Sequence, residues 1–395
     1  MEEQGIVMDE YNCMKKELEL YLHIPFCVKK CAYCDFLSGP LDEGTREKYV
    51  NALIKEICGY GDLTHKYHVT TIFLGGGTPS ILESTQIIRI FDALSRTFHI
   101  AGDAEITIEA NPGTVTVEKL EAYKQCGINR ISFGLQTTNN EELKLLGRIH
   151  TYEEFLESYQ LARDCKFDNI NVDLISAIPK QTVESWEESL KKVIALVPEH
   201  ISAYSLIVED GTPFANVYGE GCPGEHDLPS EETERAIYYR TEEVLEVAGY
   251  CRYEISNYAK KGKECRHNLG YWERKEYLGI GLGAASLVDN VRYKNTDDLL
   301  FYIEHSSDLG AIQENVEQLS VKEQMEEFMF LGLRKMEGIS ISEFKNAFGR
   351  SMEACYGEQI RVLTEQGLLK QKGGRLMLTK QGIDVSNYVF GEFLQ

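Results

Sequence analysis

The chain has 395 residues, and its 63 Asp and Glu against 41 Lys and Arg give a formal net charge of −22. Such acidity argues against nucleic acid as a partner, because nucleic-acid binding normally needs a basic footprint. No apolar run approaches the ~18–20 residues of a membrane span, and the acidic N-terminus lacks the apolar core of a secretory signal. The composition therefore predicts a cytoplasmic protein with one large and one smaller domain, and it leaves peripheral contact with a membrane open.

A strand-then-helix pattern repeats six times through the first half of the chain. The expected strands are 17–24, 69–74, 104–109, 130–136, 169–179 and 200–213, the last around Tyr204. Apolar residues at helical spacing predict helices over 45–60, 84–98, 117–127 and 185–196, with two short helical stretches around 148–151. Ser84 is the expected N-cap of the second helix. Crossover helices of this length predict that the strands are parallel.

Polar and glycine residues stand near the C-terminal ends of several expected strands, at Gly75–Thr78, Glu109, Gln136 and Asp173. Doubly wound sheets and barrels both begin with this strand–helix alternation. Functional residues on one side only are typical of the C-terminal face of a (β/α) barrel. Six units rather than eight therefore predict a partial, open (β/α)6 barrel of α/β class, with a doubly wound sheet as the alternative.

The second half of the chain predicts an extension and a separate C-terminal module. A long polar helix is expected over 227–249, followed by irregular loops and short strands that pack back on the barrel. Beyond an amphipathic helix at 320–336, further helices and a hairpin turning at Gly373–Gly374 are winged-helix-like. The acidic total favours a structural or contact role for this module over DNA binding. The predicted domains are 1–226, 227–315 and 316–395.

Three cysteines, Cys27, Cys31 and Cys34, follow the first expected strand in C-x3-C-x2-C spacing, whereas the other cysteines are scattered singly. Three thiols this close favour a metal centre over disulfides in a reducing compartment. A structural zinc site would need a fourth ligand such as His23 or Asp35. An iron–sulfur cluster held by only three cysteines leaves one iron open, which can bind the amino and carboxylate groups of a small molecule. The spacing and the position after the strand favour the cluster.

The C-x3-C-x2-C loop after the first strand of a βα repeat resembles the radical S-adenosylmethionine superfamily. The fuller pattern is similar to the oxygen-independent coproporphyrinogen III oxidase-like family, and within it to the heme-chaperone branch. That pattern comprises YLHIPFC…CAYCDF, FLGGGTPS, EITIEANPGT, NRISFGLQ, LGRIH, NVDLISAIPKQ and HNLGYW. The likeness runs from about Tyr21 to the C-terminus.

The resemblance implies two cofactors and their ligands. Cys27, Cys31 and Cys34 would ligate a [4Fe-4S] cluster, and its open iron would bind S-adenosylmethionine. The resemblance places around that ligand Tyr21, Gly76, Gly77, Thr78, Glu109, Gln136, Arg148 and Asp173. The residue chemistry agrees with most of this, because glycines let backbone approach a ligand and an arginine can pair with a carboxylate. From the residues alone, a turn, a solvated arginine and strand-end capping are the alternatives.

Two features separate the chain from the oxidases of that family. The oxidases carry a fourth cysteine where this chain has Phe36, and a longer N-terminal arm where only 20 residues precede Tyr21. The heme-chaperone branch shares the Phe36 position and an H-N-x-x-Y-W motif, which here comprises His267, Asn268, Tyr271 and Trp272. The resemblance implies His267 as a heme ligand, a role in which imidazole is common. From the residues alone, His267 and Asn268 would cap a loop and Trp272 would fill the barrel mouth.

The resemblance therefore implies a heme chaperone that binds heme and transfers it to acceptor proteins, with the cluster and S-adenosylmethionine controlling dimerisation or release. Oxidative decarboxylation of coproporphyrinogen III and another radical reaction on heme are the alternatives, so enzymatic activity stays undecided. The implied partners are heme or porphyrin, heme-accepting proteins and an electron donor such as flavodoxin or ferredoxin. A homodimer is left open.

Overall fold

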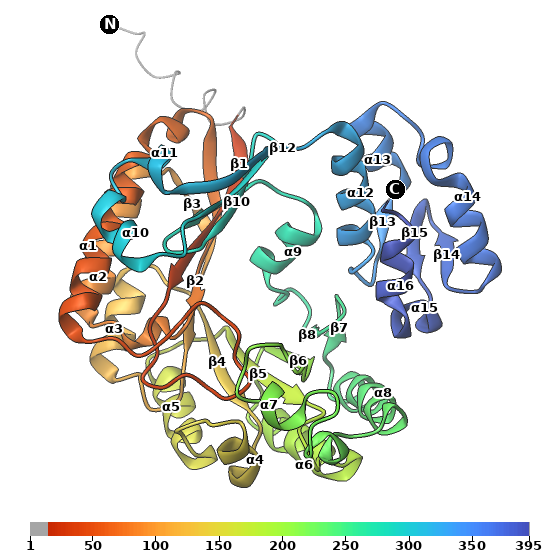
Figure 1. Cartoon of the computed structure of the whole chain (residues 1–395), viewed down its shortest axis with the longest axis horizontal. Coiled ribbons are helices and arrows are strands. Elements are labelled where there is room, and N and C mark those ends of the chain that lie inside the picture. Colours follow the sequence, from red (N-terminus) through yellow and green to blue (C-terminus); the bar gives the residue numbers. More distant parts are fainter. Residues whose placement is uncertain (1–14, 395) are drawn as a thin grey trace, which may run out of the picture.

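The computed structural model describes residues 15–394, so the N-terminal segment in which no secretory signal is expected lies outside the described residues. A 12-stranded sheet runs in the order β12-β11-β10-β9-β1-β2-β3-β4-β5-β6-β8-β7 (Figure 1). Strands β1 to β6 are parallel and adjacent in chain order. A doubly wound sheet would reverse direction at a switch point. This order has no reversal, and the expected partial barrel is confirmed.

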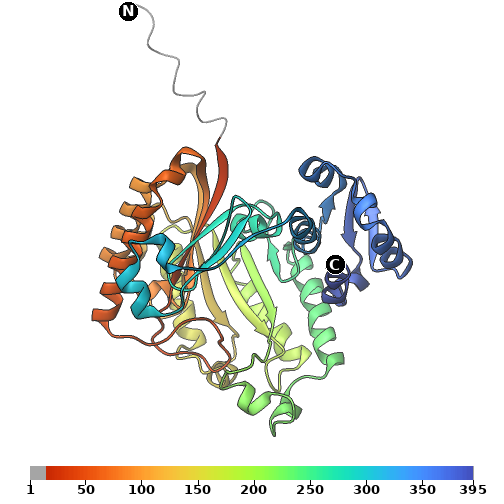
Figure 2. The same ribbon diagram turned by 45° about the horizontal axis from the view of Figure 1, so that its top comes forward.

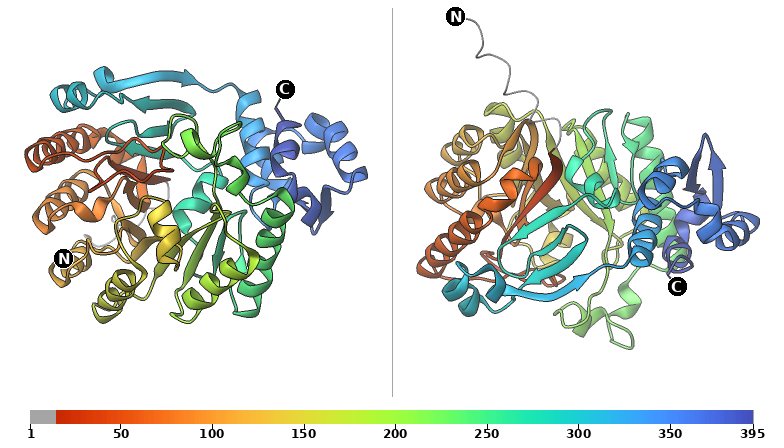
Figure 3. Two further views of the ribbon diagram at one scale, coloured as in Figure 1. Left: turned by 60° about the horizontal axis from the view of Figure 1, so that its bottom comes forward. Right: turned by 90° about the horizontal axis from the view of Figure 1, so that it is seen from above.

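The six strands of the barrel are β1 (Lys16–Ile24), β2 (Tyr67–Gly76), β3 (Ile100–Ala110), β4 (Arg130–Gln136), β5 (Ile170–Ser176) and β6 (His200–Ser205). The helices that follow them are α1 (Glu43–Gly59), α2 (Ser84–Thr97), α3 (Val117–Gln125), α4 (Asn140–Leu145), α5 (Tyr152–Asp164) and α6 (Val183–Ile194). These helices surround the outer face of the curved sheet (Figure 3). One detail of the expectation is wrong, since Ser84 is the first residue of α2 and Glu83 is its N-cap, in a capping box with Gln86.

The two faces of the barrel sheet differ in chemistry. The outer-facing side chains of β1, such as Leu20 and Leu22, are fully buried in the aliphatic core beneath the helices. Alternate residues of a strand point to the opposite face. The inner face of the six strands is mostly polar and includes Glu19, Thr71, Glu105, Glu109, Arg130, Ser132, Asn171, Asp173, His200 and Ser202. We call the space enclosed by this face the lumen.

Both edges of the barrel sheet are extended by later parts of the chain. At one edge β7 (Cys251–Arg252) and β8 (Asn257–Ala259) follow β6, and α8 (Glu231–Val247) packs on α6. At the other edge β9 (Tyr277–Ile280) runs parallel to β1. It is followed by β10 (Ala285–Val288), β11 (Val291–Asn295) and β12 (Gln313–Gln318). The short helices of this half are α7 (Ala215–Tyr218), α9 (Arg266–Trp272), α10 (Leu299–His305) and α11 (Leu309–Ile312). Figures 1 and 3 both show α9 inside the curve of the barrel.

A second core holds the C-terminal module, which lies beside the barrel next to α8 (Figure 2). Its helices are α12 (Val321–Gly332), α13 (Ile341–Phe348), α14 (Met352–Glu365), α15 (Lys380–Asp384) and α16 (Ser386–Gly391). Its sheet has the order β13-β15-β14, with β13 (Ile339–Ser340), β14 (Leu369–Lys372) and β15 (Arg375–Leu378). The hairpin turns at Gly373–Gly374, as expected, and both glycines have positive φ. The end of the chain forms two short helices where one was expected.

The division at 226 and 315 stays a prediction. Among the helices of residues 15–394, none is both long and apolar enough to cross a membrane.

Candidate functional site

The three cysteines of the motif lie on the loop between β1 and α1 (residues 25–42), which we call the cysteine loop. Their half-buried thiols line one cavity of about 400 Å³ at the C-terminal ends of the barrel strands, which we call the strand-end pocket. Backbone hydrogen bonds hold the loop in place, from Cys27 N–H to the carbonyl of Gly39 at 3.0 Å and from Ala32 N–H to that of Leu146 at 3.0 Å. The thiols therefore stand on a fixed backbone.

The strand-end pocket also gathers seven of the eight residues that the resemblance implies for S-adenosylmethionine. These are Gly76, Gly77, Thr78, Glu109, Gln136, Arg148 and Asp173. The eighth, Tyr21, stands behind the wall, where its hydroxyl lies 3.1 Å from His23 Nδ1. A Cβ atom on Gly75 would lie 3.2 Å from the Tyr21 ring, so this tyrosine supports the pocket wall without lining it.

The glycines of the GGGT run are required by the packing of the chain itself. Gly76 has a φ of +107°, and a Cβ atom there would lie 2.6 Å from the His23 ring. A Cβ atom on Gly77 would lie 2.6 Å from the carbonyl oxygen of Phe26. Any side chain would push β2 and the cysteine loop apart. The same close approach leaves backbone exposed to the pocket, where a ligand can reach it.

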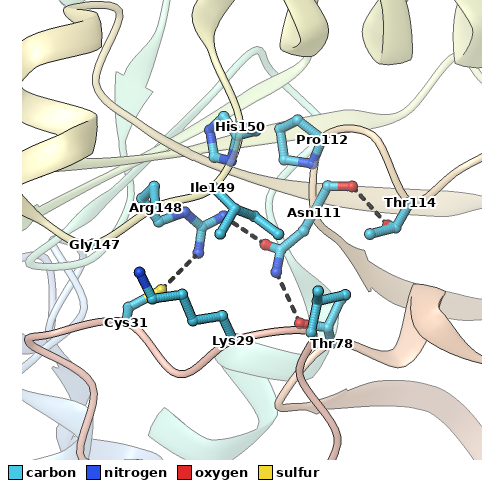
Figure 4. Close-up of a pocket in the computed structure, with 11 residues that line it drawn as sticks. Lys29, Cys31, Thr78, Asn111, Pro112, Thr114, Gly147, Arg148, Ile149 and His150 are labelled. Atoms are coloured by element: carbon cyan, nitrogen blue, oxygen red, sulfur yellow. Dashed lines mark hydrogen bonds between the residues drawn. The ribbon is translucent and has the colours of Figure 1, made fainter. Parts of the chain in front are cut away.

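A hydrogen-bonded chain through Arg148, Asn111 and Thr78 joins the sulfurs of Cys31 and Cys27, and Figure 4 shows it from Cys31 as far as Thr78. The half-buried Arg148 donates to Cys31 Sγ at 3.4 Å and to Asn111 Oδ1 at 2.7 Å. Asn111 donates to Thr78 Oγ1 at 2.8 Å, and Thr78 donates to Cys27 Sγ at 3.6 Å. The chain thus places the positive guanidinium of Arg148 directly beside the sulfur of Cys31. Sequence reasoning missed Asn111, although it stands only two residues after Glu109.

Two half-buried acids, Glu109 on β3 and Asp173 on β5, face the pocket. Glu109 Oε2 accepts a hydrogen bond from Gly76 N–H at 3.2 Å, and burial raises the pKa of its carboxyl to about 8. Asp173 accepts hydrogen bonds from Ser132 Oγ at 2.9 Å and Asn171 Nδ2 at 2.7 Å, and burial also raises its pKa. Burial disfavours the ionised form of both carboxyls. A cationic ligand beside them would stabilise that form, so the pair favours a ligand with positive charge.

Gln136 occupies a strained backbone position at the end of β4. Its φ is +75°, and the register of β4 against β5 shifts between Gly134 and Gln136. A non-glycine residue in the left-handed region has an energetic cost, and such residues concentrate at functional sites. The strain directs this residue toward the pocket, which it lines.

The donor set fits a cluster better than the zinc site considered for the same loop. Both ring nitrogens of His23 are engaged, Nδ1 with the Tyr21 hydroxyl and Nε2 with the Leu37 carbonyl oxygen at 2.9 Å. Within residues 15–394, no three His, Cys, Asp or Glu side chains converge as a single metal ion would require. The three cysteines instead line a cavity, and the Arg148 guanidinium lies 3.4 Å from Cys31 Sγ. A cluster, which is wider than one ion, suits such spacing.

His267 lies away from the strand-end pocket. It is 1% exposed, within α9, and its Nδ1 lies 2.6 Å from Thr71 Oγ1 while its Nε2 lies 3.1 Å from the Tyr271 hydroxyl. Burial lowers the pKa of His267 to about 3 and raises that of the nearby Glu19 to about 9, so both side chains are uncharged at neutral pH. A heme iron would have to displace one of these hydrogen-bond partners. The assignment of His267 as a heme ligand stays a prediction.

The simpler interpretation of the H-N-x-x-Y-W motif needs correction as well. Cys265, and not His267 or Asn268, is the N-cap residue of α9. Trp272 does not fill the barrel mouth, because the guanidinium of Arg334 in the C-terminal module lies over its ring at 4.3 Å. The motif therefore packs into the lumen on one side and against the C-terminal module on the other.

The mouth of the strand-end pocket carries exposed apolar side chains. Phe36 is 63% exposed and Ile207 is 67% exposed, and both line the pocket from facing loops. Lys29, on the cysteine loop, also lines it. Sequence reasoning singled out Phe36 only as a missing cysteine. It missed Ile207, because the segment after Ser205 was expected to continue as a strand and forms a loop.

Residues 21–193 match the family model of the radical SAM superfamily, and residues 319–385 match that of the HemN C-terminal domain. The heme chaperone HemW of Bacillus subtilis strain 168 is 37% identical over 375 residues, which cover 95% of this chain and 98% of that protein. HemW of Lactococcus lactis is 38% identical, over 96% of this chain and 98% of that protein. The solved structure of coproporphyrinogen III oxidase (HemN), a radical SAM enzyme of Escherichia coli, superposes with a TM-score of 0.84 at 25% identity, over 96% of this chain and 90% of that one.

Proposed function

The chain belongs to the heme chaperone HemW family of radical SAM proteins, and from this premise we propose that it binds heme and transfers it to heme-accepting proteins. In this proposal the strand-end pocket holds a [4Fe-4S] cluster and S-adenosylmethionine. The observation that carries the proposal is the gathering of three cysteines, two half-buried acids and a half-buried arginine around one cavity, whose mouth carries the exposed apolar side chains of Phe36 and Ile207.

Each group of residues has a distinct role in the proposed site. Cys27, Cys31 and Cys34 would hold the cluster, and a cluster with only three cysteine ligands would leave one iron free to bind S-adenosylmethionine. Arg148, which donates a hydrogen bond to Cys31 Sγ, would hold this ligand in position. Glu109, at the pocket wall, would face the positive charge of the ligand.

The apolar mouth offers a contact surface for the porphyrin ring. Phe36 and Ile207 stand on facing loops, and exposed apolar side chains gathered at a pocket mouth mark a ligand surface. Lys29 would pair with a propionate group of heme. A fourth cysteine at position 36 would make this side of the mouth less apolar. Phe36 thus supports contact with the macrocycle.

We extend the proposal to the partners and the location. As partners we propose acceptor proteins for heme, an electron donor such as flavodoxin or ferredoxin, and a second copy of this chain in a homodimer. A cytoplasmic protein that touches the membrane surface peripherally fits the same role. Within the chain, the barrel of 1–226 would carry the cluster, while 227–315 and 316–395 would form the extension and the winged-helix-like domain.

A second candidate, oxidation of coproporphyrinogen III, is favoured by the structural likeness to the E. coli enzyme over nearly the whole chain. The two functions are separated by one experiment on the anaerobically reconstituted protein. With S-adenosylmethionine, a reductant and coproporphyrinogen III, we expect no protoporphyrinogen, whereas heme titration should show saturable, stoichiometric binding. Formation of protoporphyrinogen would overturn the chaperone proposal in favour of the oxidase, and absence of heme binding would refute the proposal outright.

A further inference from the structure

A line of aromatic rings connects α9 to the wall of the strand-end pocket. The His267 ring stacks on Phe73 with centroids 5.2 Å apart and an interplanar angle of 25°. Phe73 in turn stacks on Tyr21 at 6.4 Å and 27°. Both Phe73 and Tyr21 pack against Gly75, since a Cβ atom there would lie 3.0 Å from the Phe73 ring and 3.2 Å from that of Tyr21. The position of the imidazole is therefore transmitted by direct contact to the glycine run.

Helix α9 is held in the lumen so closely that His267 has little freedom. Gly270 faces Glu19, and a Cβ atom on this glycine would lie 1.9 Å from Glu19 Oε1. On the other side of His267 the rings continue, with Tyr271 at 4.9 Å and then Tyr277, on β9, at 4.8 Å from Tyr271. The His267 N–H of the backbone donates to Glu105 Oε1 at 3.2 Å. Both the helix and the imidazole are thus fixed on all sides.

We propose that His267 is a positioning residue for the strand-end pocket, and that its imidazole, stacked on Phe73, holds Tyr21 and the Gly75–Gly77 wall where S-adenosylmethionine binds. The inference rests on the proposed function, because it takes the pocket to be the site of that ligand. It gives the motif a role that needs no contact with heme. Close packing transmits displacement, so a cavity at His267 lets Phe73 and Tyr21 relax toward α9 and away from the glycines.

The test compares variants of the cluster-loaded full chain. Binding of S-adenosylmethionine is measured by anaerobic equilibrium dialysis, and its ligation to the open iron by the change it causes in the electron paramagnetic resonance spectrum of the reduced cluster. We expect His267→Ala and Phe73→Leu each to weaken binding about tenfold, because each removes a stacked ring. His267→Phe restores the ring without any nitrogen, and we expect it to recover most of the lost affinity.

Two features of the design keep the outcomes distinct. His305 stacks on Phe301 at 4.1 Å on helix α10, outside the strand-end pocket, so His305→Ala is a matched control that should leave the affinity unchanged. Phe73→Leu keeps His267 itself, and it decides the question if His267→Ala fails to fold.

Heme titration of the same proteins separates a positioning role from an iron-ligand role. We expect His267→Phe to bind heme with the wild-type stoichiometry. If His267→Phe loses heme while His267→Ala and Phe73→Leu bind S-adenosylmethionine as wild type does, the inference is wrong and His267 acts as a heme ligand. Failure of the wild-type protein to bind S-adenosylmethionine would instead refute the proposed function on which the inference rests.

Discussion

The cysteine loop and helix α9 both border the lumen of the barrel, yet their side chains meet opposite environments. The loop carries half-buried thiols and the exposed Phe36, all on one cavity. In α9, both nitrogens of His267 already have partners inside the protein. The thiols of the cysteine loop are therefore open to a ligand in the cavity, whereas the ring nitrogens of His267 are already engaged by neighbouring side chains. A motif of polar residues does not by itself show that these residues bind a ligand. The hydrogen-bond partners of their side chains show whether they are free to do so.

The largest difference between the two regions should appear in the cluster itself. We expect Cys31→Ala to abolish the iron and sulfide content and the brown absorbance of the reconstituted protein, because two thiolates cannot hold a four-iron cluster stably. His267→Ala should keep a full cluster, since α9 contributes no ligand. Cys58→Ala, at an exposed cysteine outside the pocket, is the control. A full cluster in Cys31→Ala would show that this cysteine is not a ligand.

A smaller effect is expected at the mouth of the pocket. Replacing Phe36 and Ile207 together by serine removes the apolar surface proposed for the porphyrin ring, and heme affinity should fall about tenfold or more. Binding of S-adenosylmethionine, deeper in the pocket, should stay unchanged. Val247→Ser is the matched control, because Val247 is an apolar side chain that is 91% exposed at the end of α8. Equal heme affinity in the double variant and in the control would place the heme elsewhere.

The smallest effect is a dependence on pH. Burial raises the pKa of Glu109 to about 8, so its carboxyl is mostly neutral at pH 7. The sulfonium of S-adenosylmethionine is a permanent cation, which favours the ionised carboxylate. The affinity for S-adenosylmethionine should therefore rise as the pH increases toward about 8 and should level off above that pH. Because only one proton is released, the rise should be no more than tenfold per pH unit.

The Glu109→Gln variant removes this titration. Its affinity should be lower at high pH and nearly flat across the range, while the wild type rises. The empty wild-type protein should show the opposite trend in stability, since a raised folded-state pKa gives stability that is lost as pH rises through about 8. A wild-type affinity that does not change with pH would exclude Glu109 as the group facing the charge.

Sequence reasoning predicted the barrel and most of the strand-end pocket, because both depend on local patterns. Strand–helix alternation predicts parallel strands, and the polar residues at their C-terminal ends favoured a barrel, in which strand ends meet at one rim. The exact neighbours at that rim depend on side-chain direction and loop path. Asn111 and Ile207 were missed for this reason. The burial of His267 could not be predicted from the sequence either, because it depends on where α9 packs in the lumen. Its partner Thr71 lies some 200 residues away along the chain.

One signal in the sequence could have revealed the lumen. In β1 the segment LELYLHI alternates strictly between aliphatic residues and Glu19, Tyr21 and His23. A strand that is buried in apolar surroundings on both faces has a nearly continuous run of apolar residues in its sequence. Strict alternation in a strand that is covered by helices on one side indicates a polar interior on the other.

The pairing of β1 with β9 has a consequence for how the protein is made. About 250 residues of chain separate these neighbouring strands. At ~5–20 residues per second, a ribosome needs roughly 13–50 s to supply β9 after β1 has formed. During this interval one edge of β1 lacks its partner, directly beside the newly made cysteine loop. A chain released before residue 280 would therefore retain an unpaired strand edge, which is prone to aggregation, beside the three cysteines.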